Sequence, residues 1–341
     1  MKRHKKLAVN KWTGGTLLAG LSLVGLPAAA QEVENLNDGV NGPAEQAVQA
    51  PETGGRLPIT ATAGIAEQFN SKINDTSASF SITRLSAAVL VPIRLNDQFQ
   101  LGNSFRYGLD SYNFNSYSAN FPAAPWHNIN TISLASVLKW KMDDTWTFYG
   151  GGFVRMSADS SVEMEEGATG GGLGGFDYKV NDTLSLGAGA AIAKQIADHA
   201  LFVPLITAKW KFADDWMLTA GLTDVATMGY GVEAKWHFDD AWDFGFGLQY
   251  HKSRFRINSA AANRFAPNPG LVSTADGVGQ EKSSILYASA TWHADPKVDV
   301  TGFVGLTVGG DLKVENNSGD QLAGHTYKAT ATVGAKASVR F

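Results

Sequence analysis

The chain has 341 residues, no cysteine and a formal net charge of −4 at neutral pH. Without cysteine an exported protein has no disulfide framework, and a net negative charge gives no reason to expect nucleic-acid binding. Only 18% of the residues are charged, yet no run of eighteen apolar residues offers a transmembrane helix.

The first thirty residues have the features of a secretory signal peptide. A basic start precedes the apolar run TLLAGLSLVGL at residues 16–26, and the small residues PAAA follow at 27–30. An apolar run of this length is too short for a membrane anchor and is typical of a cleaved export signal. We expect cleavage between Ala30 and Gln31. This would remove five basic residues and leave 23 basic against 32 acidic side chains, a net charge of −9.

Residues 31–56 differ from everything that follows them. The segment QEVENLNDGVNGPAEQAVQAPETGGR is polar, rich in Gln, Glu, Pro and Gly, and without apolar periodicity. Such a composition offers too little apolar surface to fold, so we expect a flexible periplasmic leader. The remaining residues, 57–341, are predicted to form one folded domain.

In this domain apolar and polar residues alternate, as they do in β-strands with two different faces. The first hairpin alternates least well, because Leu90 and Pro92 in FSITRLSAAVLVPIR (80–94) fall on the wrong face. The last strand is the clearest, since every second residue of TYKATATVGAKASVRF, counted back from Phe341, is apolar or aromatic. The same alternation occurs in 230–238, 242–250 and 298–308.

Short turns and longer loops alternate between the strands. Turn residues mark six positions: Asn96-Asp97, Asp143-Asp144, Asn181-Asp182, Asp214-Asp215, Asp239-Asp240 and Asp295-Pro296. Longer connections fall near 70–78, 112–129, 159–169, 195–200, 225–228, 257–282 and 311–324. Six turns and seven loops predict fourteen strands, an even number that brings both ends of the domain to the side of the turns. Twelve strands is the alternative, because the first hairpin is weakly patterned.

Three related segments carry two tryptophans, six residues apart, around a pair of turn residues: LKWKMDDTW, AKWKFADDW and AKWHFDDAW. An even separation keeps both side chains on one face, and their parity puts them on the apolar face. Indole favours the membrane–water boundary, because its ring is apolar and its N–H needs a partner. We therefore predict an aromatic girdle, with core aromatics of a soluble sheet as the alternative. The girdle would contain Trp140, Trp146, Trp210, Trp216, Trp236, Trp242 and Trp292.

Two-faced strands suit either a soluble sandwich, which joins its apolar faces, or a membrane barrel, which turns them toward lipid. The export signal, several strands of twelve or more residues and a final Phe341 favour the barrel. Unequal spacing disfavours a propeller. The sequence thus predicts an all-β, antiparallel up-and-down transmembrane barrel in the outer membrane of a Gram-negative-type envelope.

Several segments of the last third occur together: GYGVEAKWHFDDAWDFGFGLQYHKSRFRI at 229–257, a turn with Pro296, and the Gly-Gly-x-Leu step at 309–312 before an Asn-rich loop. This pattern resembles a family of uncharacterised bacterial outer-membrane barrels with no assigned activity, so the resemblance implies fold and location only. Phe341 resembles the terminal signature that the barrel-assembly machinery reads. That machinery and outer-membrane lipid are the expected partners.

Few residue patterns in the sequence indicate catalysis or ligand chemistry. Residues 170–175, GGGLGG, formally contain the GxGxxG motif of dinucleotide sites, but no helix is predicted after them, so we interpret them as a Gly-rich strand. His251 and Ser253 lie two apart on one face, as in a hydrolase pair, but no acid or oxyanion donor can be placed beside them. We predict no enzymatic activity, no cofactor and no metal site.

The charges expected on the inner face are more informative. Eight basic residues have inward parity near the turns: Lys139, Lys141, Lys179, Lys209, Lys211, Lys235, Lys336 and Arg340. Such a ring would bias a pore toward anions, or it would brace the rim by pairing with turn aspartates. The sequence predicts a passive, narrow, porin-like channel for small solutes. A non-conducting surface barrel is the first alternative, and a lipid hydrolase is a distant third.

Overall fold

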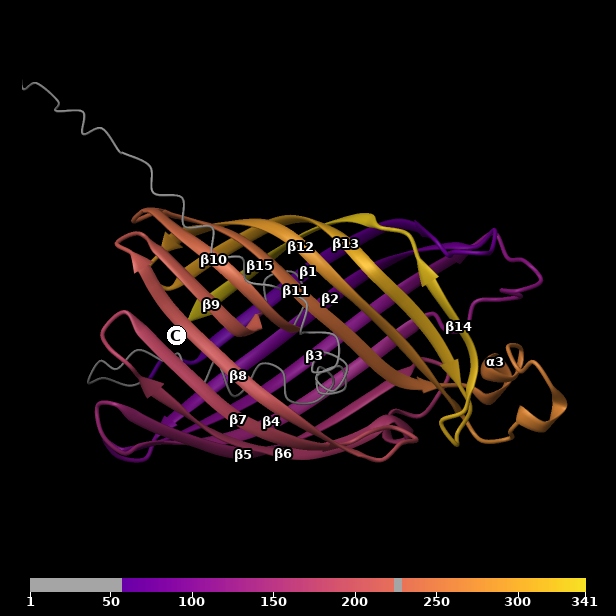
Figure 1. Cartoon of the computed structure of the whole chain (residues 1–341), viewed down its shortest axis with the longest axis horizontal. Coiled ribbons are helices and arrows are strands. Elements are labelled where there is room, and N and C mark those ends of the chain that lie inside the picture. Colours follow the sequence, from indigo (N-terminus) through magenta and orange to yellow (C-terminus); the bar gives the residue numbers. More distant parts are fainter. Residues whose placement is uncertain (1–56, 224–228) are drawn as a thin grey trace, which may run out of the picture.

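The computed structural model describes residues 57–223 and 229–341, which form one long β-barrel (Figure 1). The predicted signal peptide and leader, residues 1–56, lie outside the described residues. None of the helices in the described part of the chain is long and apolar enough to cross a membrane.

Fifteen strand segments make the wall. The first eight are β1 (Thr60–Lys72), β2 (Ser79–Arg94), β3 (Phe99–Asn115), β4 (Asn128–Lys141), β5 (Trp146–Asp159), β6 (Ala168–Lys179), β7 (Leu184–Lys194) and β8 (Ala200–Ala213). The other seven are β9 (Trp216–Thr223), β10 (Gly229–Asp239), β11 (Trp242–Ile257), β12 (Gly277–Asp295), β13 (Val298–Glu315), β14 (Gln321–Tyr327) and β15 (Thr330–Arg340). Short helical turns occur in two loops: η2 (Met164–Gly167), α3 (Ser259–Asn263) and η3 (Pro269–Leu271).

The wall closes where β1 meets β15, from the pair Thr60 and Arg340 to the pair Gln68 and Thr332. The other strands pair antiparallel with their neighbours in sequence. β14 and β15 both pair with β13 and are separated only by residues 328–329, so together they make one interrupted strand. The wall therefore has fourteen strands, which confirms the first prediction, and the alternative of twelve is wrong.

The first hairpin is a regular part of this wall. β2 and β3 pair without interruption from Ser79 with Asn115 to Arg94 with Gln100. Leu90 and Pro92, which break the alternation in the sequence, are buried on the inner face of the barrel. They interrupt the alternation because part of the inner wall is packed with other side chains rather than exposed to water.

Hydrogen bonds from Asn and Asp side chains shape the short turns. Asp143 Oδ1 lies 2.7 Å from the backbone nitrogens of Thr145 and Trp146, and these two donors hold the pKa of Asp143 below its usual value. The same side-chain-to-backbone bond occurs at Asn96, Asn181, Asp239 and Asp295. Such a turn is tight, so the tryptophans before and after it stay on the same face of the sheet.

An aromatic band runs around the outside of the barrel next to these turns. All seven tryptophans of the predicted girdle have outward parity, and Trp210 and Trp292 are each 46% exposed. Neighbouring strands bring the rings together: Trp216 stacks on Trp236 at a centroid distance of 5.9 Å. We call this end of the barrel the turn end and the opposite end the loop end. That the band lies at a membrane boundary stays a prediction.

Phe341 lies at the turn end beside the start of the wall. Its backbone nitrogen donates to the carbonyl oxygen of Ile59 at 2.9 Å, and its side chain is 71% exposed. The ring is thus not needed to fill a core. Recognition of Phe341 by the barrel-assembly machinery stays a prediction.

Candidate functional site

The wall folds over the lumen at the loop end. β11 has 16 residues, but β10 pairs with it only as far as Gln249. Beyond that residue β11 runs beside β5, where Arg256 and Ala158 form a parallel bridge. Arg155 Nη1 also donates to the carbonyl oxygen of Arg254 at 3.1 Å. We call this contact between β5 and β11 the seam.

A packed apolar cluster, which we call the cap, fills the loop end beside the seam. The loop between β3 and β4 carries Trp126 into it, where the indole is 2% exposed and 5.0 Å from the ring of Phe255. The cap draws its residues from β2–β4, β11, β13, β14 and the loops beside them. They are Ile73, Ala78, Phe80, Ile82, Tyr112, Phe114, Phe121, Ala124, Trp126, Ile129, Phe255, Ile257, Ala262, Phe265, Leu312, Val314, Leu322 and Tyr327. The contact between the rings of Tyr112 on β3 and Phe255 on β11 carries the cap across the lumen at this end.

A buried ionic group lies against the inner side of the cap. Glu281, fully buried, is 3.0 Å from Arg84 Nη2, 2.5 Å from Tyr327 Oη and 3.4 Å from His251 Nε2. Arg84 Nε lies 3.8 Å from Asp110 Oδ1. A carboxylate in this position is stable only because several donors replace the water that it has lost. The group joins β2, β3, β11, β12 and β14 across the inside of the barrel.

Apolar side chains also line the middle of the lumen. One cluster on β4–β8 comprises Val137, Phe153, Leu173, Ala191, Ala193, Val203 and Leu205. A smaller one on β1, β12 and β13 comprises Ala66, Ile285, Tyr287 and Phe303. In β6 the glycines are required here, because a Cβ at Gly171 would come within 2.6 Å of the Phe153 ring. The GGGLGG segment is thus a strand over which aromatic rings pack.

The turn end of the lumen is charged. All eight predicted basic residues lie on inward positions there. Five of them have interaction partners. Lys141 pairs with Asp144 at 3.0 Å, Lys179 with Asp182 at 2.7 Å, and Arg340 with Asp299. The hydrogen bond and charge of the Lys179 side chain lower the pKa of Asp182. Lys139 and Lys336 also have interaction partners.

The other three lysines make no ion pair among the described residues. Lys209 and Lys211 lie on β8, and Lys235 lies on β10, with β9 between them. Met217 of β9 pairs with Lys211 on one side and Lys235 on the other. These three lysines form a local positive patch on the inner wall rather than a complete ring.

A chain of histidines and aspartates joins five strands at the same end. His237 Nδ1 is 2.8 Å from Asp243 Oδ1, and His293 Nε2 is 3.2 Å from the other oxygen of Asp243. His293 Nδ1 is also 2.7 Å from Asp299 Oδ1, and Asp299 binds Arg340. The chain fixes the inner rim and takes up part of its charge.

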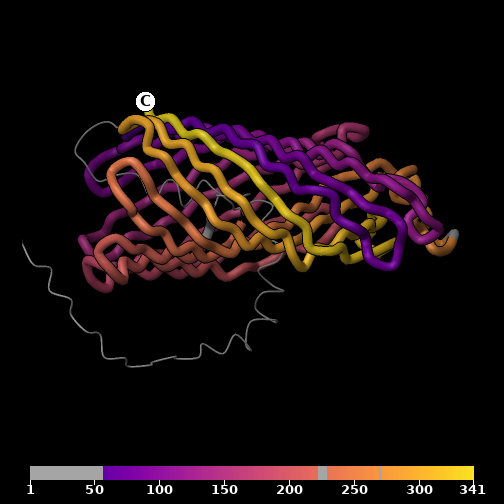
Figure 2. Tube along the Cα trace, turned by 90° about the horizontal axis from the view of Figure 1, so that it is seen from above, coloured from indigo at the N-terminus to yellow at the C-terminus, as the bar shows by residue number. Residues whose placement is uncertain are grey.

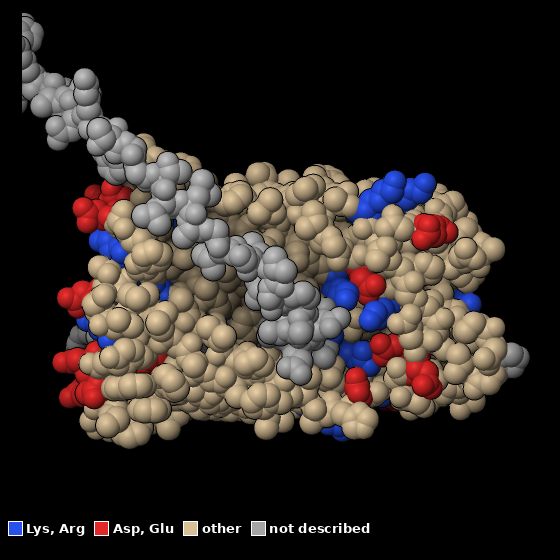
Figure 3. Space-filling model, viewed as in Figure 1, with Lys and Arg blue, Asp and Glu red and all other residues tan. Residues whose placement is uncertain are grey.

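A gap interrupts the hydrogen-bonded wall on the turn-end side of the seam. Within the described residues, β8 pairs with β9 only from Ala208 to Ala213, which leaves residues 200–207 without a strand partner on that edge. The edge of β11 at 250–255 is likewise unpaired. On the loop-end side of the gap, Arg254 Nε donates to the carbonyl oxygen of Ile196 at 3.1 Å. Figure 3 shows this face hollowed between the β9–β10 hairpin and a group of charged side chains.

The predicted hydrolase pair lies in the buried ionic group. An acid is present after all: Glu281, the strand partner of Ser253, is next to His251. It is held by Arg84 and Tyr327, however, and Ser253 is only 4% exposed. The three side chains brace the barrel interior and are covered by the cap.

Sequence reasoning missed the most constrained residues of the lumen. Arg84 and Glu281 interrupt apolar alternation only as isolated charges, and they lie 197 positions apart in the chain. Trp126 is one of two tryptophans outside the predicted girdle. Its position in a long loop was the available signal, because a large apolar side chain in such a loop needs a place to bury itself.

A closed wall of fourteen antiparallel strands with an apolar outer face and an aromatic band defines a transmembrane β-barrel of the outer-membrane type. No known protein-family model matches the sequence, and no curated protein does.

Solved structures with a similar wall include a FadL homologue of Pseudomonas aeruginosa, at 12% identity, a TM-score of 0.48, and 89% of this chain and 93% of that chain covered. A mutant of TodX, a monoaromatic hydrocarbon channel, matches at 10% identity and a TM-score of 0.46, with 88% and 93% covered. The KdgM porin matches at 9% identity and a TM-score of 0.30, with 81% and 97% covered. At these values no substrate can be transferred to this chain.

Proposed function

We propose that this barrel is a passive outer-membrane channel for small solutes and has no enzymatic activity. The path runs from the turn end into the lumen and leaves through the wall gap between β8 and β11. The gap carries the proposal, because unpaired strand edges are not tolerated against hydrocarbon and must face water or solute. Pro204 lies in the β8 edge of the gap, where its missing N–H costs no ladder bond. The cap supports the same route, since it occupies the direct exit.

Chemical blocking tests the route. The chain has no cysteine, so single cysteines can be labelled cleanly. Leu201 points inward on the gap edge of β8, and its neighbour Phe202 is 60% exposed on the outer face. We expect a bulky thiol reagent to abolish most of the current of Leu201→Cys in a planar bilayer and to leave Phe202→Cys unchanged. Equal currents after labelling would contradict a path through the gap.

We further propose that the channel favours anions, through the local positive patch of Lys209, Lys211 and Lys235. Replacing all three with Gln should move the reversal potential in a salt gradient toward that of a non-selective pore, because the unpaired charges would be gone. The matched control is Lys141→Gln with Lys179→Gln, which removes lysines that are already paired with Asp144 and Asp182. A larger change in the control would place the selectivity elsewhere.

A non-conducting barrel is the second candidate, and the cap is the observation that favours it. Eighteen buried residues from both halves of the chain fill the loop end. If the purified barrel shows no conductance in a planar bilayer, the cap is a permanent closure and the protein is a surface structure. The lipid hydrolase is the least favoured candidate, because His251, Ser253 and Glu281 lie beneath the cap.

A further inference from the structure

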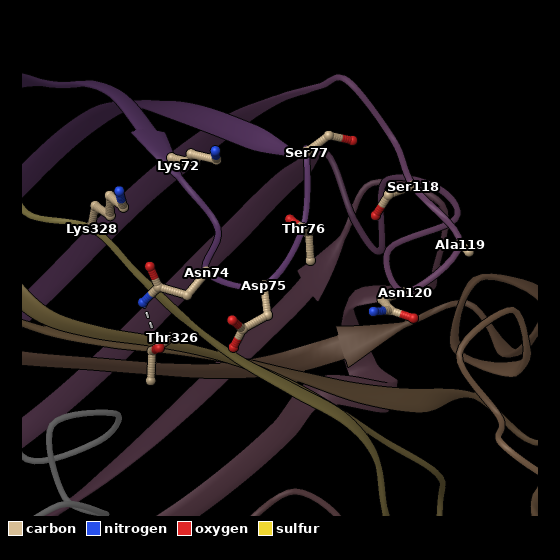
Figure 4. Close-up of a pocket in the computed structure, with 10 residues that line it drawn as sticks. All are labelled: Lys72, Asn74, Asp75, Thr76, Ser77, Ser118, Ala119, Asn120, Thr326 and Lys328. Carbon is tan, nitrogen blue, oxygen red and sulfur yellow. Dashed lines mark hydrogen bonds between the residues drawn. The ribbon is translucent and has the colours of Figure 1, made fainter.

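A second cavity lies outside the lumen. It has a volume of about 820 Å³ and is formed at the loop end by the β1–β2 loop, the β3–β4 loop and the end of β14 (Figure 4). Lys72 and Lys328 line it and are exposed, while their chain neighbours Ser71 and Tyr327 are buried on the inner side. The cavity therefore opens on the outer surface of the barrel.

The interruption between β14 and β15 creates the positive charge of this cavity. Residues 328–329 leave the β13 ladder, and the backbone nitrogen of Lys328 donates to the carbonyl oxygen of Lys72 at 2.9 Å. This bond brings two lysines of distant sequence side by side. Neither makes an ion pair within the described residues, and Asp75 is the one acid among the lining residues. Figure 3 shows blue and red side chains together at the loop end of this face.

Uncharged polar groups surround the two lysines. Thr76, Ser77, Ser118 and Asn120 line the cavity. The hydroxyl of Ser118 is buried and has no hydrogen-bond partner in the described part of the chain, and in Figure 4 it is directed toward the space between the two loops. A ligand rich in acceptor and hydroxyl groups would satisfy it.

The walls of the cavity are held in a fixed shape. Asp75 and Ser116 have left-handed backbones, with φ of 58° and 59°, which is a cost for residues other than glycine. Ser77 Oγ donates to the carbonyl oxygen of Ser116 at 3.1 Å and ties the two loops together. Asn74 Nδ2 donates to Thr326 Oγ1 at 2.7 Å and ties the first loop to β14. A site that is preformed loses little entropy when a ligand binds.

We propose that this cavity binds the phosphorylated saccharide headgroup of an outer-leaflet glycolipid. The lysines are compact cations suited to phosphate, and the amides and hydroxyls suit sugar. The cavity lies on the outer face, just beyond the apolar residues of β15 such as Val333, where headgroups meet a barrel wall. The loop end faces the cell exterior in this proposal, because barrels of this type have short periplasmic turns and longer extracellular loops. The inference rests on the outer-membrane placement proposed above, but not on conduction.

Titration of the purified full chain in detergent with lipid A, followed by native mass spectrometry, tests the proposal. We expect Lys72→Gln with Lys328→Gln to bind lipid A at least about tenfold more weakly, because two charged contacts to phosphate are lost. The matched control is Lys194→Gln, an exposed lysine at the loop end of β7 that does not line the cavity. It should bind like the unchanged protein.

Three results would overturn the assignment. The double variant would bind as well as the control, lipid A stripped of its phosphates would bind as well as intact lipid A, or inorganic phosphate at millimolar concentration would displace the lipid and mark a site for soluble anions. The circular dichroism of the double variant confirms that it is folded. Conductance is measured separately, so a barrel that binds lipid A without conducting would disprove the channel and keep this site.

Discussion

Replacing Arg84 with Ala is expected to reduce the free energy of unfolding by about 3–5 kcal/mol, the cost of leaving a buried charge without its partner. Arg84 Nη2 is 3.0 Å from Glu281 Oε2, and the two side chains are 9% and 0% exposed. Without the guanidinium, Glu281 keeps Tyr327 and His251 near its oxygens. Urea unfolding from lipid vesicles, followed by tryptophan fluorescence, measures the change.

Two further variants serve as controls for this measurement. Lys179→Ala removes an ion pair with side chains 48% and 95% exposed, so the loss should be small compared with that of Arg84→Ala, because water screens the pair. Arg84→Met combined with Glu281→Leu removes both buried charges and should recover most of the stability lost in Arg84→Ala. If Arg84→Ala is no worse than Lys179→Ala, the interior at Glu281 is wet and the ionic group is not sealed by the cap.

Placing Arg at Leu85 is expected to cost about 2–4 kcal/mol, the penalty of a cation facing lipid near the middle of a bilayer. Leu85 is 42% exposed on the outer face of β2, near the middle of that strand, and it is paired on both sides, with Ile65 and Leu109. The same unfolding measurement applies. If this side chain faced water instead of lipid, the substitution would be nearly neutral. A loss of this size therefore indicates contact with lipid.

The neighbouring residue supplies the control at almost the same depth. Ser86 points into the lumen, is exposed there, and is paired with Gly64 and Gly108. Ser86→Arg places a cation near water, so we expect a much smaller loss of stability. Equal losses for Leu85→Arg and Ser86→Arg would contradict the assignment of the two faces.

The wall was predictable because its rules are local. Alternation with a period of two fixes which side chains point outward, and Asn or Asp at each turn marks where a strand reverses. These two signals are sufficient for fourteen strands, for the outward tryptophans and for the inward lysines. They hold along β13 as far as Gly309, whose φ of 63° starts a bulge. Beyond it the parity inverts, and Leu312 and Val314 turn inward.

The lumen was not predictable because its contacts are not local. The seam depends on a difference in length between β10 and β11, which is visible only when both are placed side by side. The eight basic residues share one parity, yet parity does not tell which of them meets an aspartate. Turn geometry decides this: Asp144 and Asp182 each follow their lysine by three residues and fold back onto it.

The composition of the cap has a consequence for the order of assembly. Its residues come from two segments, 73–129 and 255–327, while none comes from β5–β10. Figure 2 shows chain from both of these segments, indigo to purple and orange to yellow, at the same end of the barrel. Contacts between such distant segments form late, after the intervening strands have joined the sheet, because closing a long loop of chain is slow. We therefore expect the middle hairpins to be in place before the cap packs. In that order of events a nascent barrel is open at both ends, and packing of the cap is the last step of its maturation.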